Sequence, residues 1–294
     1  MSNQPPYLPT ALGVSKTTLL LSNNPSNGPY AWQLPQCSIS SNPYSGGGNT
    51  GATGTYGLFN CIAIQNGAIS AVVWFYLPPG GEGAMLGFSN ALYPNGATAF
   101  TPWLYVGTNS YLYAGDWNGG HWQVSTPISP GWHMAVIEEW ATSTSGPYYI
   151  ALYLDGNYIG QGSSSNLPQL FGYVSNYPYN TIGGGYGYTW PNIPSHWFFF
   201  NGTIAYVALY NRVLTTSDVL AIYQGVRITS GLVAEYAGNN YNPSTGVWID
   251  SSGNNYNITT TVVAGQYPPR GCILWPADTL STWPNSTWLT WPQC

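Results

Sequence analysis

Few residues of this chain could do acid–base chemistry, because only 4% of its 294 residues are charged. The neighbouring carboxylates Glu138 and Glu139 are the first place to look for a polysaccharide hydrolase. Retaining hydrolysis needs two carboxyl groups about 5.5 Å apart on one side of the substrate, whereas adjacent strand residues point to opposite faces. We therefore predict no glycosidase pair here. One of the two side chains is expected to complete a hydrogen-bond network or to face solvent.

The three histidines could suggest a metal site or a catalytic triad. His133 falls in an expected strand and is interpreted as structural, whereas His121 and His196 fall in loops rich in Gly, Trp and Pro. The sequence has no Gly-x-Ser-x-Gly nucleophile motif and no HExxH zinc motif. We expect no catalytic residue and no cofactor.

Aromatic residues in polar loops carry a stronger chemical signal. Sugars bind flat aromatic rings, with amide and carboxylate groups orienting their hydroxyls, and this needs no net charge. The loops 116–122, 176–179 and 183–197 offer that mixture, although such rings could equally cover the fold and stabilise long loops. The candidate glycan-binding residues are Asp116, Trp117, Asn118, Trp122, Tyr186, Tyr188 and Trp190.

The four cysteines indicate an oxidising location. They show no CxxC spacing, so two disulfides are predicted rather than a zinc site. Proximity in sequence favours Cys37 with Cys61 and Cys272 with Cys294, and the other two pairings remain open. Each short loop would be worth roughly 3 kcal/mol. Glycosylation sequons occur at Asn201, Asn257 and Asn285.

Charge excludes several partners. Four Lys and Arg residues cannot neutralise a phosphate backbone, so nucleic-acid binding is excluded, and anionic membranes are equally poor partners. The longest apolar runs, such as 204–210, are far shorter than the roughly 20 residues of a membrane span. With nine carboxylates and three histidines, little can titrate, which favours an acidic or hot external medium. Weak charge repulsion also favours self-association.

Short β-branched and aromatic runs recur from residue 56 onward and predict a β-sandwich. Asp155-Gly156-Asn157 predicts a tight hairpin, and 215–224 predicts one short helix ending at Gly225. Residues 1–55 are interpreted as an arm or extension. The expected strands include 69–77, 103–107, 111–114, 133–140, 148–154 and 202–210.

Two sequence blocks resemble the laminin-G-like, concanavalin A-like family. The segment GWHMAV at 131–136, followed by ALYLDG at 151–156, is similar to that family's paired central strands. FNGTIAYVALYNRVL at 200–214 is similar to its closing strand and the helix after it. The resemblance covers about residues 56–226 and implies a jelly-roll sandwich.

The resemblance also implies calcium at the sandwich rim, for which Asp116 is the candidate ligand, although hard cations need several oxygens. A further fragment, GLVAEY at 231–236 with WIDSSGN at 248–254, resembles the opening strand of such a domain but follows it here. Either a second, truncated domain begins at residue 231, or this strand completes a sheet edge in its own chain or in a neighbour. We favour the added strand, because the residues that remain are too few for a second sandwich.

We thus divide the chain into an arm (1–55), a jelly-roll sandwich (56–228) and a C-terminal strand with a Trp- and Pro-rich strap (229–294). The strap carries Trp275, Trp283, Trp288 and Trp291. No secretory signal is evident at the N-terminus, so either a signal was removed or the protein leaves the cell with a particle.

We interpret the chain as a non-catalytic, lectin-like protein that binds glycans for adhesion or host attachment. It would be extracellular, displayed on a virion or appendage of a thermoacidophilic archaeal system, with glycans and other subunits as partners. The alternatives are a capsid or filament subunit that uses the jelly roll for assembly only, and an extracellular glycoside hydrolase.

Overall fold

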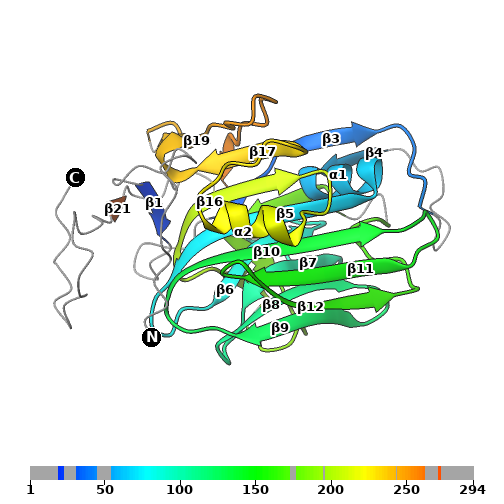
Figure 1. The fold of residues 1–294 in the computed structure, drawn as a ribbon, viewed down its shortest axis with the longest axis horizontal. Coiled ribbons are helices and arrows are strands. Elements are labelled where there is room, and N and C mark those ends of the chain that lie inside the picture. Colours follow the sequence, from blue (N-terminus) through cyan, green and yellow to red (C-terminus); the bar gives the residue numbers. More distant parts are fainter. Residues whose placement is uncertain are drawn as a thin grey trace.

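The computed structural model describes residues 19–22, 31–44, 54–172, 177–194, 196–242, 244–261 and 271–272. These residues form two packed β-sheets whose strands are antiparallel except where β15 meets β6 (Figure 1). The all-β sandwich predicted from the strand pattern is confirmed. Among the described residues, no helix has the length and apolar character needed to cross a membrane.

The first sheet runs in the order β12 (Asn157–Ser164), β11 (Tyr148–Leu154), β10 (Gly131–Ala141), β5 (Ala68–Leu77), β16 (Thr203–Tyr210), β1 (Leu19–Ser22) and β21 (Gly271–Cys272), with β17 (Leu232–Ala237) also on β16. The second runs β20 (Thr260–Thr261), β2 (Trp32–Gln33), β13 (Tyr179–Ile182), β6 (Gly83–Ser89), β7 (Phe100–Val106), β8 (Tyr111–Trp117) and β9 (His121–Pro127). A hairpin of β14 (Gly184–Tyr186) and β15 (Trp197–Phe199) joins the second sheet at β6. Two small sheets are separate: β3 (Gln36–Ile39) with β4 (Gly54–Gly57), and β18 (Tyr241–Asn242) with β19 (Val247–Trp248).

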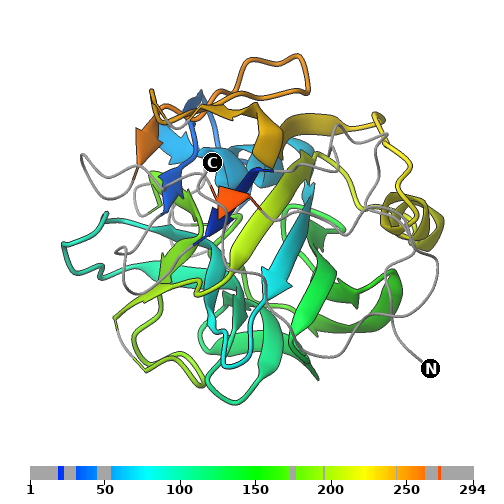
Figure 2. The same ribbon diagram turned by 90° about the vertical axis from the view of Figure 1, so that its left-hand side faces the viewer.

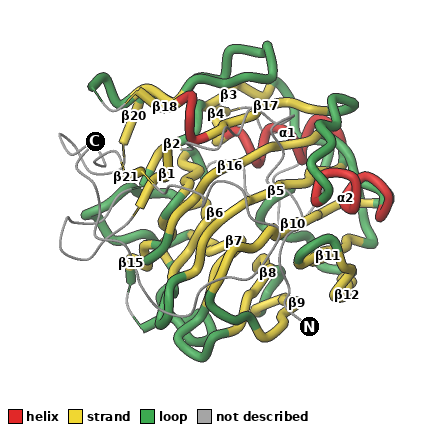
Figure 3. Tube along the Cα trace, turned by 60° about the vertical axis from the view of Figure 1, so that its left-hand side comes forward, coloured by secondary structure: helices red, strands yellow, loops and turns green. Residues whose placement is uncertain are grey.

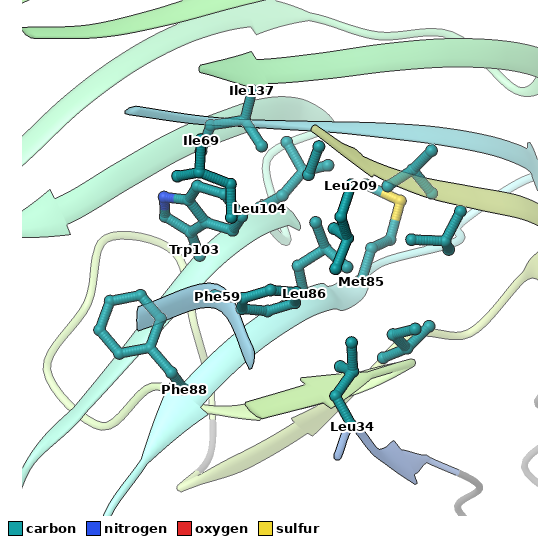
Figure 4. Packing of buried hydrophobic residues seen from close by; sticks show 14 of the residues in the cluster. Leu34, Phe59, Ile69, Met85, Leu86, Phe88, Trp103, Leu104, Ile137 and Leu209 are labelled. Carbon is teal, nitrogen blue, oxygen red and sulfur yellow. The ribbon is translucent and has the colours of Figure 1, made fainter. Parts of the chain in front are cut away.

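The main core lies between the two sheets. Figure 4 shows Ile69 and Ile137 of the first sheet facing Trp103 and Leu104 of the second, with Phe59 beside them. Strand β5 is buried on both faces, because its alternate residues pack into a second cluster on the outer side of the first sheet. This double burial explains why residues 69–77 are apolar, apart from Ser70, rather than alternating.

Helix α2 (Thr216–Tyr223) covers that outer side and confirms the predicted helix. Thr215 caps it in a reciprocal pair with Asp218, and Gly225 follows its end with φ +94°. The ring of Tyr223 stacks on Trp74 of β5 with centroids 5.7 Å apart. The helix therefore closes an apolar sheet face that would otherwise meet water.

A second helix, α1 (Leu58–Asn66), was not predicted. Its first seven residues are buried, so it lacks the one-sided apolar periodicity by which an amphipathic helix is recognised. Cys61 of α1 forms a disulfide with Cys37 of β3, which confirms the first predicted pairing. The second pairing, the strap and Asn285 involve residues outside the described ranges.

The hairpin at Asp155-Gly156 is confirmed, with both residues at positive φ and Leu154 paired with Asn157. The displaced fragment also has a definite place, because β17 pairs with β16 of its own chain, matching Tyr236 to Val207. Strand β1 occupies the remaining length of the same β16 edge, matching Leu21 to Ile204. Strand β17 therefore completes a sheet edge in its own chain and not in a neighbour.

Segments from both ends of the chain meet at this side of the sandwich. Strand β1 pairs with β21, seen in blue and red in Figure 2. Strand β2 pairs with β20 in the second sheet, which Figure 3 shows from another side. Strands β1 and β2 from the N-terminal part and β17, β20 and β21 from the C-terminal part therefore extend the same two sheets as the central region.

Candidate functional site

The two neighbouring glutamates point to opposite faces of β10, as predicted. Glu138 lies on the outer side, where Oε1 accepts hydrogen bonds from Ser70 Oγ at 3.1 Å and from the Leu214 backbone N–H at 2.9 Å. Its residue is 1% exposed, and burial raises the pKa of Glu138 to about 7 despite these bonds. Glu138 therefore completes a hydrogen-bond network, and neither glutamate faces solvent.

Glu139 points into the sandwich and meets Asp116 of β8. Both residues are 0% exposed, and their carboxyl groups lie close enough for each to shift the pKa of the other. Oε2 of Glu139 accepts from the Trp103 indole N–H at 3.0 Å, while Oε1 receives no hydrogen bond from an N–H or hydroxyl of the described residues. An oxygen with no donor beside a second carboxyl is the geometry of a protonated acid that itself donates.

The hydrogen bonds that Asp116 accepts indicate that it is the ionised member of the pair. Its oxygens accept from the backbone N–H of Trp117 at 2.6 Å and of Leu170 at 2.9 Å. Burial raises the pKa of Asp116 to about 6, and burial together with the Asp116 charge raises the pKa of Glu139 well above its usual range. Two carboxylate charges this close in a buried site repel each other, so we infer that the pair retains one proton.

This placement corrects the expectation that Asp116 lies at the sandwich rim. A carboxylate with 0% exposure and its oxygens occupied by donors cannot orient a sugar hydroxyl or meet a rim calcium ion. The calcium prediction thereby loses its candidate ligand. Among the described ranges, no three His, Cys, Asp or Glu side chains are grouped so that they could hold a metal ion.

The aromatic candidates divide according to the pleat of the β8–β9 hairpin. Trp117 pairs with His121 and Gly115 with Gln123, and these positions lie on the outer side of the second sheet. Trp122 lies on the inner side, 9% exposed and packed into the main core. We expected Trp122 to contact a ligand through an exposed ring. That prediction is wrong, because the ring is buried in the core.

His121 is exposed and joins two tryptophans on this outer side. Its ring lies 5.1 Å from Trp117, which is half-buried, and 4.9 Å from Trp190, by ring centroids. Trp190 is only 3% exposed, because it lies over Gly115, where an added Cβ would stand 3.0 Å from the indole. Trp190 is thus a support beneath the surface rather than an exposed platform, contrary to expectation.

The loop that carries Trp190 also presents a second aromatic group. Tyr188, 52% exposed, stacks on His196 with centroids 4.3 Å apart and planes 10° from parallel. Tyr186 is 6% exposed and packs edge-on between Phe100 and Trp197. Like Trp190, it supports the loop from below and does not offer an exposed ring to a ligand. Asn118 lies in the β8–β9 turn, partly buried, with its backbone N–H donating to Gly120.

Polar groups beside these rings are held in place by hydrogen bonds. Gln123 Nε2 donates to the Tyr105 hydroxyl at 2.7 Å, and that hydroxyl donates to the Pro191 carbonyl at 3.0 Å. The Tyr113 hydroxyl accepts from the amides of Asn109 and Asn192, each at 2.8 Å. We call the exposed and half-buried set Trp117, His121, Gln123, Tyr188 and His196 the outer aromatic face.

Sequence reasoning missed His121, Gln123 and His196 as members of this face. The alternation at 121–125 could have placed His121 and Gln123 beside Trp117, whereas the stacking of His196 on Tyr188 needed the loop conformation. Of the sequons, Asn201 and Asn257 are partly buried, and Asn257 Oδ1 accepts from the Asp250 backbone N–H at 2.9 Å. Their glycosylation stays a prediction.

Comparison with protein-family models finds no match, and none of the curated proteins matches the chain. Solved structures do show a likeness. A putative carbohydrate binding protein from Bacteroides ovatus has 14% identity and a TM-score of 0.47, and the match covers 83% of this chain and 58% of that one.

The CBM40 of the Ruminococcus gnavus IT-sialidase, bound to α2,3-sialyllactose, has 15% identity and a TM-score of 0.38, with 65% and 97% covered. A SAP-like pentraxin from Limulus polyphemus has 12% identity and a TM-score of 0.43, with 81% and 92% covered. At these identities the likeness concerns the fold and not the function.

Proposed function

We propose that this chain is a non-catalytic, lectin-like glycan-binding protein and that the outer aromatic face is its sugar-binding surface. The observation that carries the proposal is the pleat of β8–β9, which places Trp117, His121 and Gln123 together on one outer side. An indole and an imidazole offer rings for the apolar side of a pyranose, and the amide offers both a donor and an acceptor. None of these groups needs a counter-charge.

The outer aromatic face is held rigid before any ligand binds, which also supports a role in glycan binding. Trp190 underlies His121, and the Gln123 amide is fixed by Tyr105, so the surface is built before a ligand arrives. Tyr188 and His196 extend it along the loop that also carries Trp190. A surface of rigid rings and tethered amides loses little conformational entropy on binding.

Catalysis is not favoured by the carboxylates. Glu138 and Glu139 occupy opposite faces of one strand, and the Asp116–Glu139 pair lies inside the sandwich with no exposed area. A glycosidic bond could not reach that pair without opening the two sheets. Neither Glu138 nor the Asp116–Glu139 pair therefore supports the hydrolase alternative.

The setting we propose is extracellular, on a virion or appendage of a thermoacidophilic archaeal system, in a protein akin to the laminin-G-like family. The Cys37–Cys61 disulfide and the scarcity of charged residues support an external location. An acid pair buried without a cationic partner among its hydrogen bonds suits an acidic medium, where it keeps its proton.

The test is quenching of tryptophan fluorescence by a panel of neutral and acidic oligosaccharides, in acid and at neutral pH. Saturable binding is expected, at least tenfold weaker in Trp117→Ala. Trp140→Ala is the matched control, because Trp140 is also half-buried and stacks at 5.1 Å on Tyr149, but on the other sheet. Absence of binding to every sugar, or equal loss in both variants, would overturn the proposal and leave an assembly subunit.

A further inference from the structure

The interior of the sandwich brings a hydroxyl, a primary amide and the carboxyl pair together. The Thr101 hydroxyl donates to Gln169 Oε1 at 2.9 Å and lies 3.2 Å from Asp116 Oδ1. Thr101 is 0% exposed, like Asp116 and Glu139, while Gln169 is half-buried. A nucleophile, an acyl group that it could attack, a base and a second carboxyl that can hold a proton thus lie together, and only the amide is partly exposed.

Backbone contacts hold the amide in that position. The Gln169 N–H donates to the Trp117 carbonyl at 3.0 Å, and the next N–H, of Leu170, donates to Asp116 Oδ2 at 2.9 Å. The Asn60 side chain of α1 holds the Leu170 carbonyl at 3.1 Å. The segment after β12 is therefore fixed against β8 and α1, and Gln169 is presented to Thr101 of β7 rather than left free in solvent.

We propose that Thr101 and Gln169 are a site of intramolecular ester formation. Thr101 Oγ1 attacks Gln169 Cδ and forms the Oγ1–Cδ bond, while the Cδ–Nε2 bond breaks. The hydroxyl proton passes to the Asp116 carboxylate and from there to the departing nitrogen, which leaves as ammonia. One ester and one ammonia replace one hydroxyl and one amide, and no oxidant or other reactant is needed.

Asp116 is the catalytic base in this step, because it touches the hydroxyl that must lose its proton. Glu139 is a positioning residue that acts through Asp116. The groups in hydrogen-bond contact with the pair are the Trp103 indole, the Thr101 hydroxyl and the Trp117 and Leu170 amides, all of them uncharged. The raised pKa of Glu139 keeps its proton in place while Asp116 accepts a second one transiently.

The site also suits the survival of the product. Hydrolysis of an ester needs water, and three of the four side chains have no exposed area. Gln169, the half-buried member, is the side from which ammonia can leave. The bond would tie β7 to the segment after β12 across 68 positions of the chain, a covalent link independent of the redox state and of what the outer aromatic face binds.

The decisive measurement is the intact mass of the full chain after reduction and denaturation. We expect a mass below the sequence value by about 17 Da, the mass of ammonia, and fragment spectra that join the peptides of Thr101 and Gln169. Succinimide formation at Asn-Gly pairs such as Asn66-Gly67 loses the same mass, so variants must separate the two. The full sequence mass in the wild-type chain would overturn the proposal.

Four variants make the assignment specific. Thr101→Ser should keep the deficit, whereas Thr101→Val and the near-isosteric Gln169→Glu should abolish it. Thr181→Val is the control, because Thr181 is another buried threonine of the second sheet and its hydroxyl donates to the Gly184 carbonyl instead. A deficit that persists in Thr101→Val or in Gln169→Glu would assign the lost ammonia elsewhere.

Glu139→Gln tests the positioning role. Chain recovered unfolded, with full mass, is refolded over a range of pH while the deficit is followed with time. In the wild type the rate should fall once the pH is high enough to remove the shared proton. The variant should keep the rate that the wild type has at low pH, because its amide can donate to Asp116 as the protonated acid does, and it should lack that fall, because an amide does not titrate. A variant with the wild-type rate and pH profile would remove Glu139 from the mechanism.

Discussion

The carboxyl groups of Asp116 and Glu139 meet inside the sandwich, where β8 of one sheet faces β10 of the other, and each shifts the pKa of its neighbour. Neither carboxyl has a cationic partner among its hydrogen bonds, so we infer that a retained proton is what keeps the two groups from repelling each other. The strength of this contact between the sheets is therefore a function of pH, which is unusual for a contact at the centre of a core.

Stability should increase toward acid. Asp116 has a folded pKa of about 6 and Glu138 of about 7, and that of Glu139 is raised further. Above the usual carboxyl pKa the unfolded chain loses protons that the folded chain retains, so the free energy of unfolding falls as the pH rises toward these values.

Denaturant unfolding across a pH series measures this slope. Asp218 works in the opposite direction, because its hydrogen bond to Arg212 lowers its pKa, so its stabilising effect is lost only when the pH falls toward that lowered value. Glu139→Gln should flatten the slope above the usual carboxyl pKa. A protein most stable at neutral pH, with a wild-type slope in Glu139→Gln, would contradict the assignment.

Reduction of Cys37–Cys61 should lower stability by about 3 kcal/mol, because the bond restricts the unfolded chain across 24 positions. Cys61 is 2% exposed on α1, so the reduced protein also leaves a thiol pair in a packed region. The check is unfolding of the wild type and of a Cys37→Ser, Cys61→Ser double variant, with and without reductant. Reductant should shift the wild type toward the variant and leave the variant unchanged.

Gly115→Ala should disturb the outer aromatic face from below. The added Cβ would stand 2.8 Å from Gln123 Cγ and 3.0 Å from the Trp190 ring, so both must move, at a cost of about 1–3 kcal/mol. Tryptophan emission should change, and glycan affinity should fall with it. Gly120→Ala is the control in the same hairpin, because its Cβ would meet no atom within 4 Å, and its stability should stay within about 0.5 kcal/mol of wild type.

Thr215→Ala should cost about 1 kcal/mol by removing the reciprocal cap of α2. The loss is local in origin but is felt by the sheet, because α2 covers Trp74 through Tyr223. Thermal unfolding gives the size of the effect. Leu220→Ala on the exposed side of the same helix, where Leu220 is 45% exposed, should change little. An equal loss there would contradict the assignment of the Thr215→Ala effect to the cap.

Local patterns in the sequence were sufficient for the elements whose structure depends on neighbours in the chain. The positive-φ pair Asp155-Gly156 determines its hairpin, and Thr215 with Asp218 determines where α2 begins. The spacing of Cys37 and Cys61 favoured their disulfide, and the adjacency of Glu138 and Glu139 placed them on opposite faces of a strand. Each of these follows from backbone geometry over a few residues or from a short closed loop.

Tertiary structure alone decided what covers each face. Period-two alternation says that Trp117 and Trp122 lie on opposite sides, but not which side is the core, and it could not show that Trp190 and Tyr186 are buried by their own loop. The contact of Asp116 with Glu139 joins two sheets, and that of Thr101 with Gln169 spans 68 positions. Such contacts arise only when the sheets pack, because burial and the pairing of distant strands are properties of the whole chain.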